Sequence, residues 1–179
     1  MTHLYQERLA QYGLTHEQYS RAVSAHELAH ALVANARPST ASYGVEVRNG
    51  TQGVHGFART GPARGTQTVD PYDRAVLLEA GAIAKAHWLK TVEGIWSPLL
   101  ASLVHATAAG DRSHLETLGL PHHQRQAALR DACADVGTVW PSLAAGVPVL
   151  AAKGTLNERQ VANLNHTSRT RRALSYLFR

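Results

Sequence analysis

An H-E-x-x-H motif inside an apolar run constrains this chain more than any other feature. The motif is His26-Glu27-Leu28-Ala29-His30, and it lies within an apolar stretch that runs from Val23 to Val33. On a helix, this spacing places both imidazoles on one face, one turn apart, where two nitrogens can reach one metal ion. Glu27 is turned around the helix, where its carboxylate can hold and deprotonate a water molecule without ligating the metal. The apolar flanks predict a buried helix, which would give a metal site a rigid support.

The residues leave the third metal ligand open. A catalytic zinc ion usually has three protein ligands and one open position, and no third histidine follows the motif at short spacing. Glu79 would complete a His-His-Glu set, and Asp111 is the alternative. Asp111 is equally suited to be the N-cap of a short helix. His105 and His114 are weaker candidates, because helical histidines are more often hydrogen-bonded structural groups.

Start and stop signals predict that most of the chain is helical. Thr15 begins a capping box that opens the motif helix, which is expected to end near Arg37, before Pro38. Asp70-Pro71 and Ser97-Pro98 each pair an N-cap with a proline at the first helical position. Further helices are expected over residues 3–12, after a stop at Gly110, from Pro121 through Cys133, and from a second capping box at Thr155 to about residue 165.

Alternating hydrophobicity predicts two short strands after the motif helix, Ser42–Val47 and Gly53–Ala58, joined by a turn at Asn49-Gly50. Residues 60–67 are expected to form an exposed loop. The Ala80-Gly81-Ala82 segment allows close approach to a neighbouring element. Four helix breakers are expected to divide the late part of the chain into shorter pieces: Gly137, Pro141, Gly146 and Pro148. The expected fold class is therefore mainly α (α+β), with a small β-sheet next to the motif helix.

Length and composition are typical of one globular domain over residues 1–179, with a basic, flexible tail at 166–179. The only cysteine, Cys133, excludes an intramolecular disulfide, fits a reducing cytoplasm and is expected to be buried. The apolar stretches are expected to be too short and too interrupted to cross a membrane, and the N-terminus has no signal-peptide pattern. The net charge of +5 comes mostly from scattered arginines, so we do not expect a nucleic-acid partner.

The order of the motifs resembles the FtsH-type zinc metallopeptidase domain. His26–Ala31 is similar to the H-E-A-G-H-A segment of that family, and Gly53–Ala58 resembles its G-Y-T strand. Leu78–Lys85 is similar to its L-x-G-R-x-A-E-E helix. Ala109–Leu115 resembles its A-S-N-D-L segment, whose aspartate is the third zinc ligand, and Gly154–Glu158 resembles the start of its closing helix. The resemblance implies a helical, zincin-like metallopeptidase domain that holds Zn²⁺ through His26, His30 and Asp111.

Two departures from that family shape the expected function. Ala84-Lys85-Ala86 replaces the acidic pair of the second motif, and no G-x-x-x-x-G-K-[ST] phosphate loop occurs in the chain. The resemblance implies a soluble zinc endopeptidase that cleaves unstructured polypeptides without ATP, with Glu27 as general base. A separate ATPase or adaptor and a homo-oligomer are compatible with it. The alternative is a non-catalytic, metal-containing binding module that contacts nucleic acid or an acidic protein.

Overall fold

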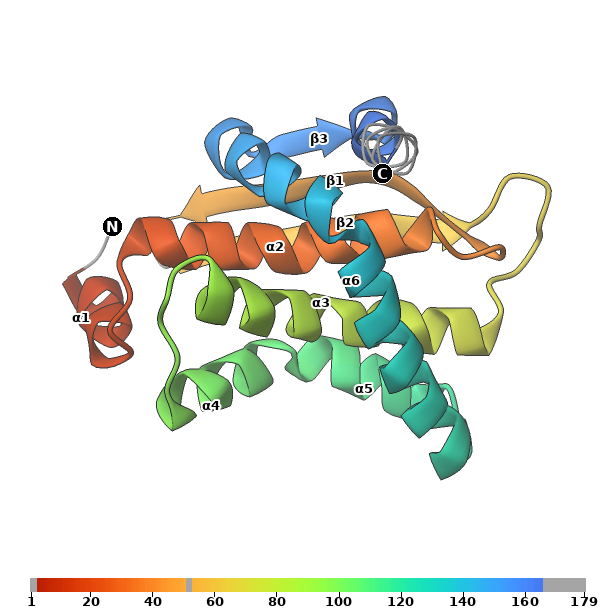
Figure 1. Ribbon diagram of the computed structural model, residues 1–179, viewed down its shortest axis with the longest axis horizontal. Coiled ribbons are helices and arrows are strands. Elements are labelled where there is room, and N and C mark those ends of the chain that lie inside the picture. Colours follow the sequence, from red (N-terminus) through yellow and green to blue (C-terminus); the bar gives the residue numbers. More distant parts are fainter. Residues whose placement is uncertain (1–2, 51–52, 166–179) are drawn as a thin grey trace, which may run out of the picture.

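Helix α2 (His16–Ala34) is the centre of the fold in the computed structural model, which describes residues 3–50 and 53–165 (Figure 1). Its predicted capping box is confirmed: Thr15 Oγ1 accepts from the Gln18 N–H, and the Gln18 side chain accepts from the Thr15 N–H. Every side chain from Ala22 to Ala34 is buried, as in a helix that is surrounded by other elements. The predicted helix is thus present, but it ends earlier than expected.

The early end of α2 has a local cause. Asn35 is the C-cap, and its side chain accepts a hydrogen bond from the Ser42 N–H at 2.8 Å. The Thr40 hydroxyl donates to the carbonyl of Ala34, one of the carbonyls that the helix end leaves without an intrahelical partner. These two bonds draw the chain directly from the helix into the first strand.

The sheet has three antiparallel strands in the order β2-β1-β3: β1 (Thr40–Gly50), β2 (Gly53–Pro62) and β3 (Thr155–Asn157). The two predicted strands are present and longer than expected. The predicted turn at Asn49-Gly50 is wrong, because both residues lie in β1 and Gly50 pairs with Gly53. Residues 60–62 continue β2 instead of opening a loop. On one side β2 pairs with β1, and its other edge is unpaired within the described residues.

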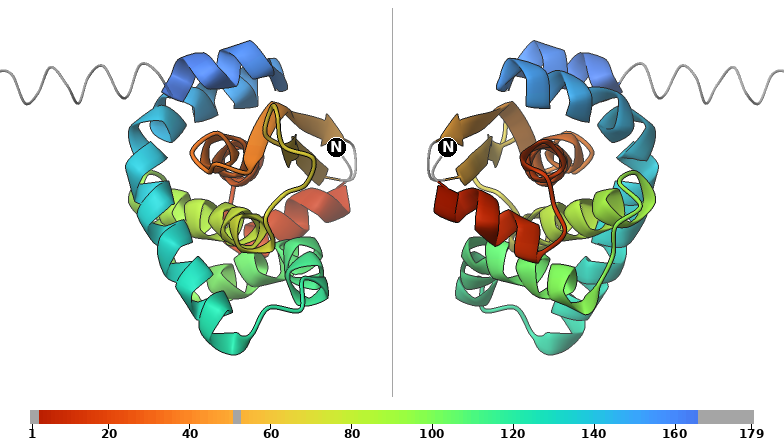
Figure 2. Two further views of the ribbon diagram at one scale, coloured as in Figure 1. Left: turned by 90° about the vertical axis from the view of Figure 1, so that its right-hand side faces the viewer. Right: turned by 90° about the vertical axis from the view of Figure 1, so that its left-hand side faces the viewer.

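The helices on one side of the sheet form successive layers, as Figures 1 and 2 show from two directions. Beyond the sheet come α2, then α3 (Pro71–Thr91), then α4 (Pro98–Thr107) and α5 (Ala109–Thr117), while α1 (His3–Gln11) lies at one end. Asp70 and Ser97 cap α3 and α4 as predicted. Gly110 does not end a helix: the chain changes direction at Ala108, so Gly110 lies inside α5.

Helix α6 (His122–Lys153) contradicts the expectation that glycine and proline divide this region. It runs through Pro141 and Pro148 and follows a curved course along the flank of the molecule (Figure 2). A proline costs a hydrogen bond and bends a helix, but α6 packs against both α2 and α3. The burial of its inner face offsets that local cost; the largest side chains buried there are Val136, Val139, Leu143, Val147 and Leu150.

Two further expectations about α6 need correction. Cys133 is exposed, because it lies on the outer face of the helix rather than among the buried residues. The helix is also long and apolar enough, by length and composition alone, to cross a membrane. Core helices of soluble proteins pass the same test, and α6 packs against α2 and α3.

The last helix begins later than predicted. Thr155 pairs with Glu46 in the sheet, so it is not available to start a helix. The capping box is formed instead by Asn157 and Gln160, whose side chains each accept the other residue's backbone N–H at 2.9–3.0 Å. Helix 158–165 follows. The basic tail at 166–179 lies outside the described residues. The mainly α (α+β) class is confirmed, with 67% of the described residues in helices and one small antiparallel sheet among them.

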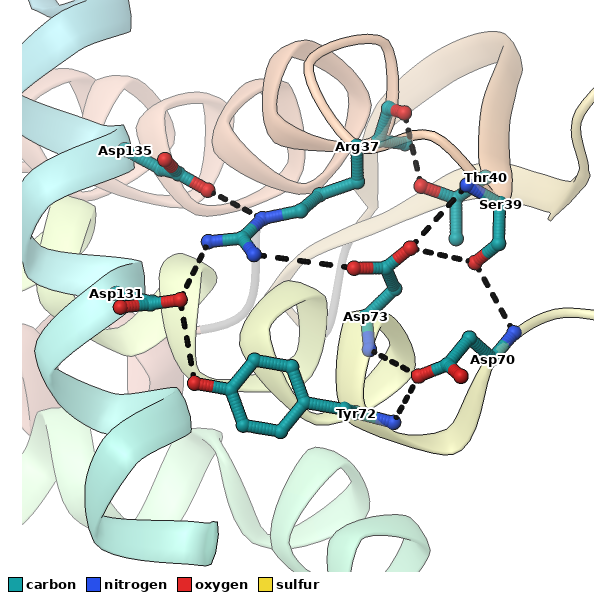
Figure 3. A network of polar contacts seen from close by, with 9 residues as sticks. Arg37, Ser39, Thr40, Asp70, Tyr72, Asp73, Asp131 and Asp135 are labelled. Atoms are coloured by element: carbon teal, nitrogen blue, oxygen red, sulfur yellow. Dashed lines mark hydrogen bonds and ion pairs between the residues drawn. The ribbon is translucent and has the colours of Figure 1, made fainter.

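A polar network around Arg37 joins the end of α2 to α3 and α6 (Figure 3). The Arg37 guanidinium donates to Asp135 Oδ2 at 2.7 Å and to Asp131 Oδ2 at 3.2 Å, and it lies 3.8 Å from Asp73 Oδ1. Asp73 also accepts from the Ser39 backbone and hydroxyl. We name Arg37, Ser39, Asp73, Asp131 and Asp135 the Arg37 network. It links the segment after the motif helix to α3 and α6 through hydrogen bonds and ion pairs.

Candidate metal centre

The two motif histidines and Asp111 meet at one point between α2 and α5. His26 Nε2 lies 3.1 Å from His30 Nε2, and Asp111 Oδ2 lies 3.0 Å from His26 Nε2 and 3.4 Å from His30 Nε2. The three atoms therefore form a nearly regular triangle. In the described part of the chain this is the one group of three histidine, cysteine or acidic side chains placed to hold a metal ion.

The size of this triangle fits a tetrahedral metal site. Zinc binds histidine nitrogen and carboxylate oxygen at roughly 2.0–2.1 Å, so neighbouring ligands of a tetrahedral ion lie about 3.3–3.4 Å apart. The observed separations of 3.0–3.4 Å need an adjustment of a few tenths of an ångström at most. Two imidazoles and one carboxylate are also a donor set that zinc accepts in catalytic sites.

The environment of His30 orients its ring for this role. Its Nδ1 lies 2.8 Å from the carbonyl oxygen of Leu77 on α3. A carbonyl can only accept, so Nδ1 carries a proton, and Nε2 is the ring atom that can present a lone pair to a metal ion at the centre of the triangle. Nδ1 of His26 is buried without a hydrogen-bond partner among the described residues. The protein thus holds the ring of His30 by a polar contact and that of His26 by packing.

Gly81 on α3 leaves the space in which the histidines meet. A Cβ atom at this position would lie 2.5 Å from His30 Nε2 and 2.7 Å from His26 Cε1, inside van der Waals contact. The close approach predicted for Ala80-Gly81-Ala82 is therefore confirmed, and the neighbour is the histidine pair. No larger residue fits at position 81 while both rings keep this arrangement.

Glu27 lies beside the triangle, against strand β2. A Cβ atom at Gly56 would lie 2.5 Å from Glu27 Cγ, so the glycine allows the strand to cover this side chain directly. Burial raises the pKa of Glu27 to about 7, although the charge of His30 and a hydrogen bond from the Ala58 backbone act in the opposite direction. A carboxylate with a pKa near neutrality is suited to accept and return a proton.

Burial and mutual contact set the protonation of the three candidate ligands. Burial lowers the pKa of His26 to about 4, so its ring is neutral at pH 7. Burial also acts to lower the pKa of His30, but the hydrogen bond and charge of Asp111 raise it overall. For Asp111, burial acts to raise the pKa, and the two histidines outweigh this and lower it. Asp111 is therefore an anion facing two ring nitrogens, and a cation bound there would compete with protons for these three atoms.

The structure separates the candidates for the third ligand. Asp111 lies in the first turn of α5, but it does not cap that helix: the N-cap position is Ala108, and no side chain caps it. Its carboxylate contacts the histidines instead. Glu79 and His105 line a neighbouring cavity of about 260 Å³, and His114 lines the cavity at the triangle. These three are not members of the triangle. The ligand role of Asp111 stays a prediction that its position supports.

Two adjoining cavities lie along β2 on either side of Glu27. The first, of about 340 Å³, contains the triangle and extends towards Thr60 and Arg74, whose side chains are hydrogen-bonded at 3.2 Å. The second, of about 320 Å³, extends towards Val54, His55 and Lys85. Both are lined by His26, Glu27, Gly56 and Thr107. Together they form a groove along β2, the strand with the unpaired edge, and we name it the β2 groove.

The second cavity contains a buried cation that sequence reasoning did not assign to the site. Lys85 on α3 is only 2% exposed, and burial lowers its pKa to about 8. Its Nζ lies 2.9 Å from Thr107 Oγ1 and 4.7 Å from the centre of the Tyr19 ring. The one signal in the sequence was that a lysine replaces an acidic residue in the motif that resembles the FtsH-type helix. Gly56 carried no signal beyond its place in a predicted strand.

No protein-family model matches this sequence, and no curated protein matches it. The function is therefore inferred from the geometry of the site itself.

Proposed function

We propose that this protein is a zinc-dependent endopeptidase that cleaves peptide bonds in extended polypeptides without ATP. One observation carries the proposal: His26 Nε2, His30 Nε2 and Asp111 Oδ2 lie within 3.4 Å of one another beside the buried carboxylate of Glu27. This combines a cation site with a general base, which is what metal-assisted hydrolysis requires.

The ligand set leaves room for the chemistry. His26, His30 and Asp111 would hold the ion, and all three line the cavity of about 340 Å³, through which water and substrate could reach it. A zinc ion held there would supply Lewis acidity, which polarises a carbonyl group and lowers the pKa of water. Glu27 would take a proton from the attacking water and return it to the leaving amine. Asp111 would contribute negative charge that offsets the positive charge of the site.

The β2 groove supports a polypeptide as the substrate. The unpaired edge of β2 offers backbone donors and acceptors, and an extended chain can add to such an edge as a further strand. Gly56 brings the strand into direct contact with Glu27, so a chain paired with β2 would pass close to the base. A small metabolite would not need a strand edge of this kind.

This mode of binding restricts the state of the substrate. A folded chain has already paired its backbone groups internally, so only a locally unfolded segment can pair with β2. At a stability of about 5 kcal/mol, a target exposes such a segment roughly once in several thousand molecules. The proposed enzyme therefore cleaves unstructured polypeptides and spares stable domains, unless a separate ATPase or adaptor unfolds them. We include membership of the FtsH-type peptidase group and a cytoplasmic location in the proposal.

The test combines metal analysis with cleavage. The purified protein should contain one zinc ion per chain and should cleave casein, but not a stable folded domain, with no added nucleotide. The matched control is Glu27→Gln, which keeps the size of the side chain and removes its basicity. We expect Glu27→Gln to retain the metal and to lower kcat by roughly 10²- to 10⁴-fold, the usual contribution of a general base.

Each contrary outcome has a distinct meaning. Loss of the metal or of the fold in Glu27→Gln would show that the glutamate is structural. A full metal content with no cleavage of any unfolded substrate would favour the non-catalytic binding module. Strict dependence on ATP would contradict independent action.

A further inference from the structure

The cation in the second cavity of the β2 groove forms no ion pair within the described residues, although the charge of Glu27, which lines the same cavity, acts to raise its pKa. No carboxylate in the described part of the chain lies within 4 Å of Lys85 Nζ, whose contacts are the Thr107 hydroxyl and the face of Tyr19. The exposed fraction of Lys85 is 2%. Burial of an ammonium group without an ionic partner costs several kcal/mol. A charge kept at that cost in a cavity marks a candidate binding group.

The position of this cation is specific to the groove. The cavity that it lines, about 320 Å³, shares His26, Glu27 and Gly56 with the cavity of the metal centre. A chain that pairs with β2 from Val54 to Ala58 would therefore pass the lysine on one side of Glu27 and the candidate ligands on the other. With a pKa of about 8, the lysine is still mostly protonated at neutral pH.

We propose that Lys85 binds a carboxylate of the polypeptide in the β2 groove, and so selects where the chain is cleaved. This inference rests on the proposed peptidase function. The carboxylate has two sources, an Asp or Glu side chain within the segment or the free C-terminus of a peptide. Tyr19 and Thr107 position the ammonium group, and the carboxylate would supply an anionic acceptor at hydrogen-bond distance, which no described residue provides.

Binding of defined peptides tests this inference separately from cleavage. Three sets of labelled, N-acetylated peptides are needed: one with a single Glu and an amidated C-terminus, one with Gln in its place, and the Gln set with a free C-terminus. Binding is measured by fluorescence anisotropy in the Glu27→Gln background, so that the bound peptide is not consumed. We expect the carboxylate at one position to strengthen binding by roughly 10- to 100-fold over the Gln set.

Variants of the lysine assign the effect. Lys85→Met and Lys85→Gln should abolish the preference for the carboxylate while binding of the Gln set is kept. Lys90→Met is the matched control, because Lys90 lies on the same helix and is exposed; it should retain the full preference. Either source of the carboxylate supports the proposal. Tighter binding of the Glu set than of the Gln set identifies a side-chain carboxylate, and tighter binding of the set with a free C-terminus identifies the terminal carboxylate.

Two results would overturn the proposal. The first is an equal affinity for the Glu and Gln sets and the free C-terminus, or a preference that persists in both Lys85 variants. The second is an equal loss of kcat on every peptide in Lys85→Met in the presence of Glu27, with KM unchanged, because the lysine would then act through Glu27. If the wild-type protein binds acidic peptides by way of Lys85 but never cleaves them, the peptidase function fails and this site remains.

Discussion

Two polar clusters, the candidate metal centre on α2 and the Arg37 network just beyond its end, differ in how their polar groups are paired. The Arg37 network places one guanidinium among three carboxylates, and its donors and acceptors meet within the protein (Figure 3). At the candidate metal centre, three potential ligand atoms face one another around a common point. Nearby, Nδ1 of His26 has no hydrogen-bond partner among the described residues, and Lys85 forms no ion pair with any of them.

From this difference we infer a structural role for the Arg37 network and a ligand-binding role for the candidate metal centre. A buried polar group that is fully paired adds to the stability and specificity of the fold. Buried polar groups that lack a hydrogen-bond or ionic partner reduce the stability of the fold. They are retained at sites where a bound ligand supplies that partner. Both clusters bring together elements that are far apart in the chain. The candidate metal centre lines a cavity of about 340 Å³ and Arg37 lines another of about 370 Å³, so the two clusters differ in how their polar groups are paired rather than in access to a cavity.

The largest expected effect is the loss of zinc affinity when the carboxylate of Asp111 is removed. Asp111→Ala should weaken zinc binding by roughly 100- to 1,000-fold, because four ligands of a structural site together contribute about 10–16 kcal/mol. Glu79→Ala should leave zinc affinity nearly unchanged, since the Glu79 carboxylate is not among the three ligand atoms that meet. Competition with a chromophoric chelator measures both values. The reverse result would assign Glu79 as the third ligand, and the contact of Asp111 with the histidines would then be structural, like those of the Arg37 network.

A single methyl group should have a similar effect at Gly81. Gly81→Ala places Cβ 2.5 Å from His30 Nε2, and we expect zinc affinity to fall by about 100-fold. The matched control is Gly137→Ala on α6, where nothing lies within 4 Å of the added atom. That variant should keep its zinc affinity and gain roughly 0.5–1 kcal/mol of stability from better helix propensity. Unchanged zinc affinity in Gly81→Ala would mean that the histidines move apart freely.

The pH dependence of stability should expose the unpaired lysine. The pKa of Lys85 is about 8 in the folded chain, against about 10.4 when unfolded. Between these values the unfolded chain binds more protons, so this group makes the free energy of unfolding rise with pH. In Lys85→Met the rise should be smaller by up to about 3 kcal/mol. Urea unfolding of both proteins from pH 7 to 10 measures it, and parallel curves would show that the charge is compensated.

Breaking the Arg37 network should affect stability alone. Arg37→Met leaves Asp73, Asp131 and Asp135 without their shared cation, and we expect a loss of about 2 kcal/mol in the free energy of unfolding. The matched control is Arg64→Met, whose exposed pair with Glu158 should contribute less than about 0.5 kcal/mol. Zinc affinity should change by less than about twofold in both. A large loss of zinc affinity in Arg37→Met would show that the two clusters are coupled through α2.

Local signals predicted much of the fold and half of the candidate site. The capping box at Thr15 and the N-caps at Asp70 and Ser97 act within one helical turn, so they can be identified without knowledge of the rest of the chain. The four-residue spacing of His26 and His30 is equally local. It places both rings on one face of any helix, and the apolar flanks correctly indicated that the helix is buried.

Only the tertiary structure decided the remainder, because it depends on which elements pack together. The residues alone left Asp111 open between capping and ligation; in the structure α5 packs on α3, and the carboxylate of Asp111 contacts the histidines of α2. Helix α6 passes through two prolines because its inner face is buried on α2 and α3, a gain that no local signal carries. Lys85 shows as a buried cation only once Tyr19, Thr107 and β2 enclose it. Side-chain burial and long-range contact are properties of the folded chain, and they supply what short-range propensities leave open.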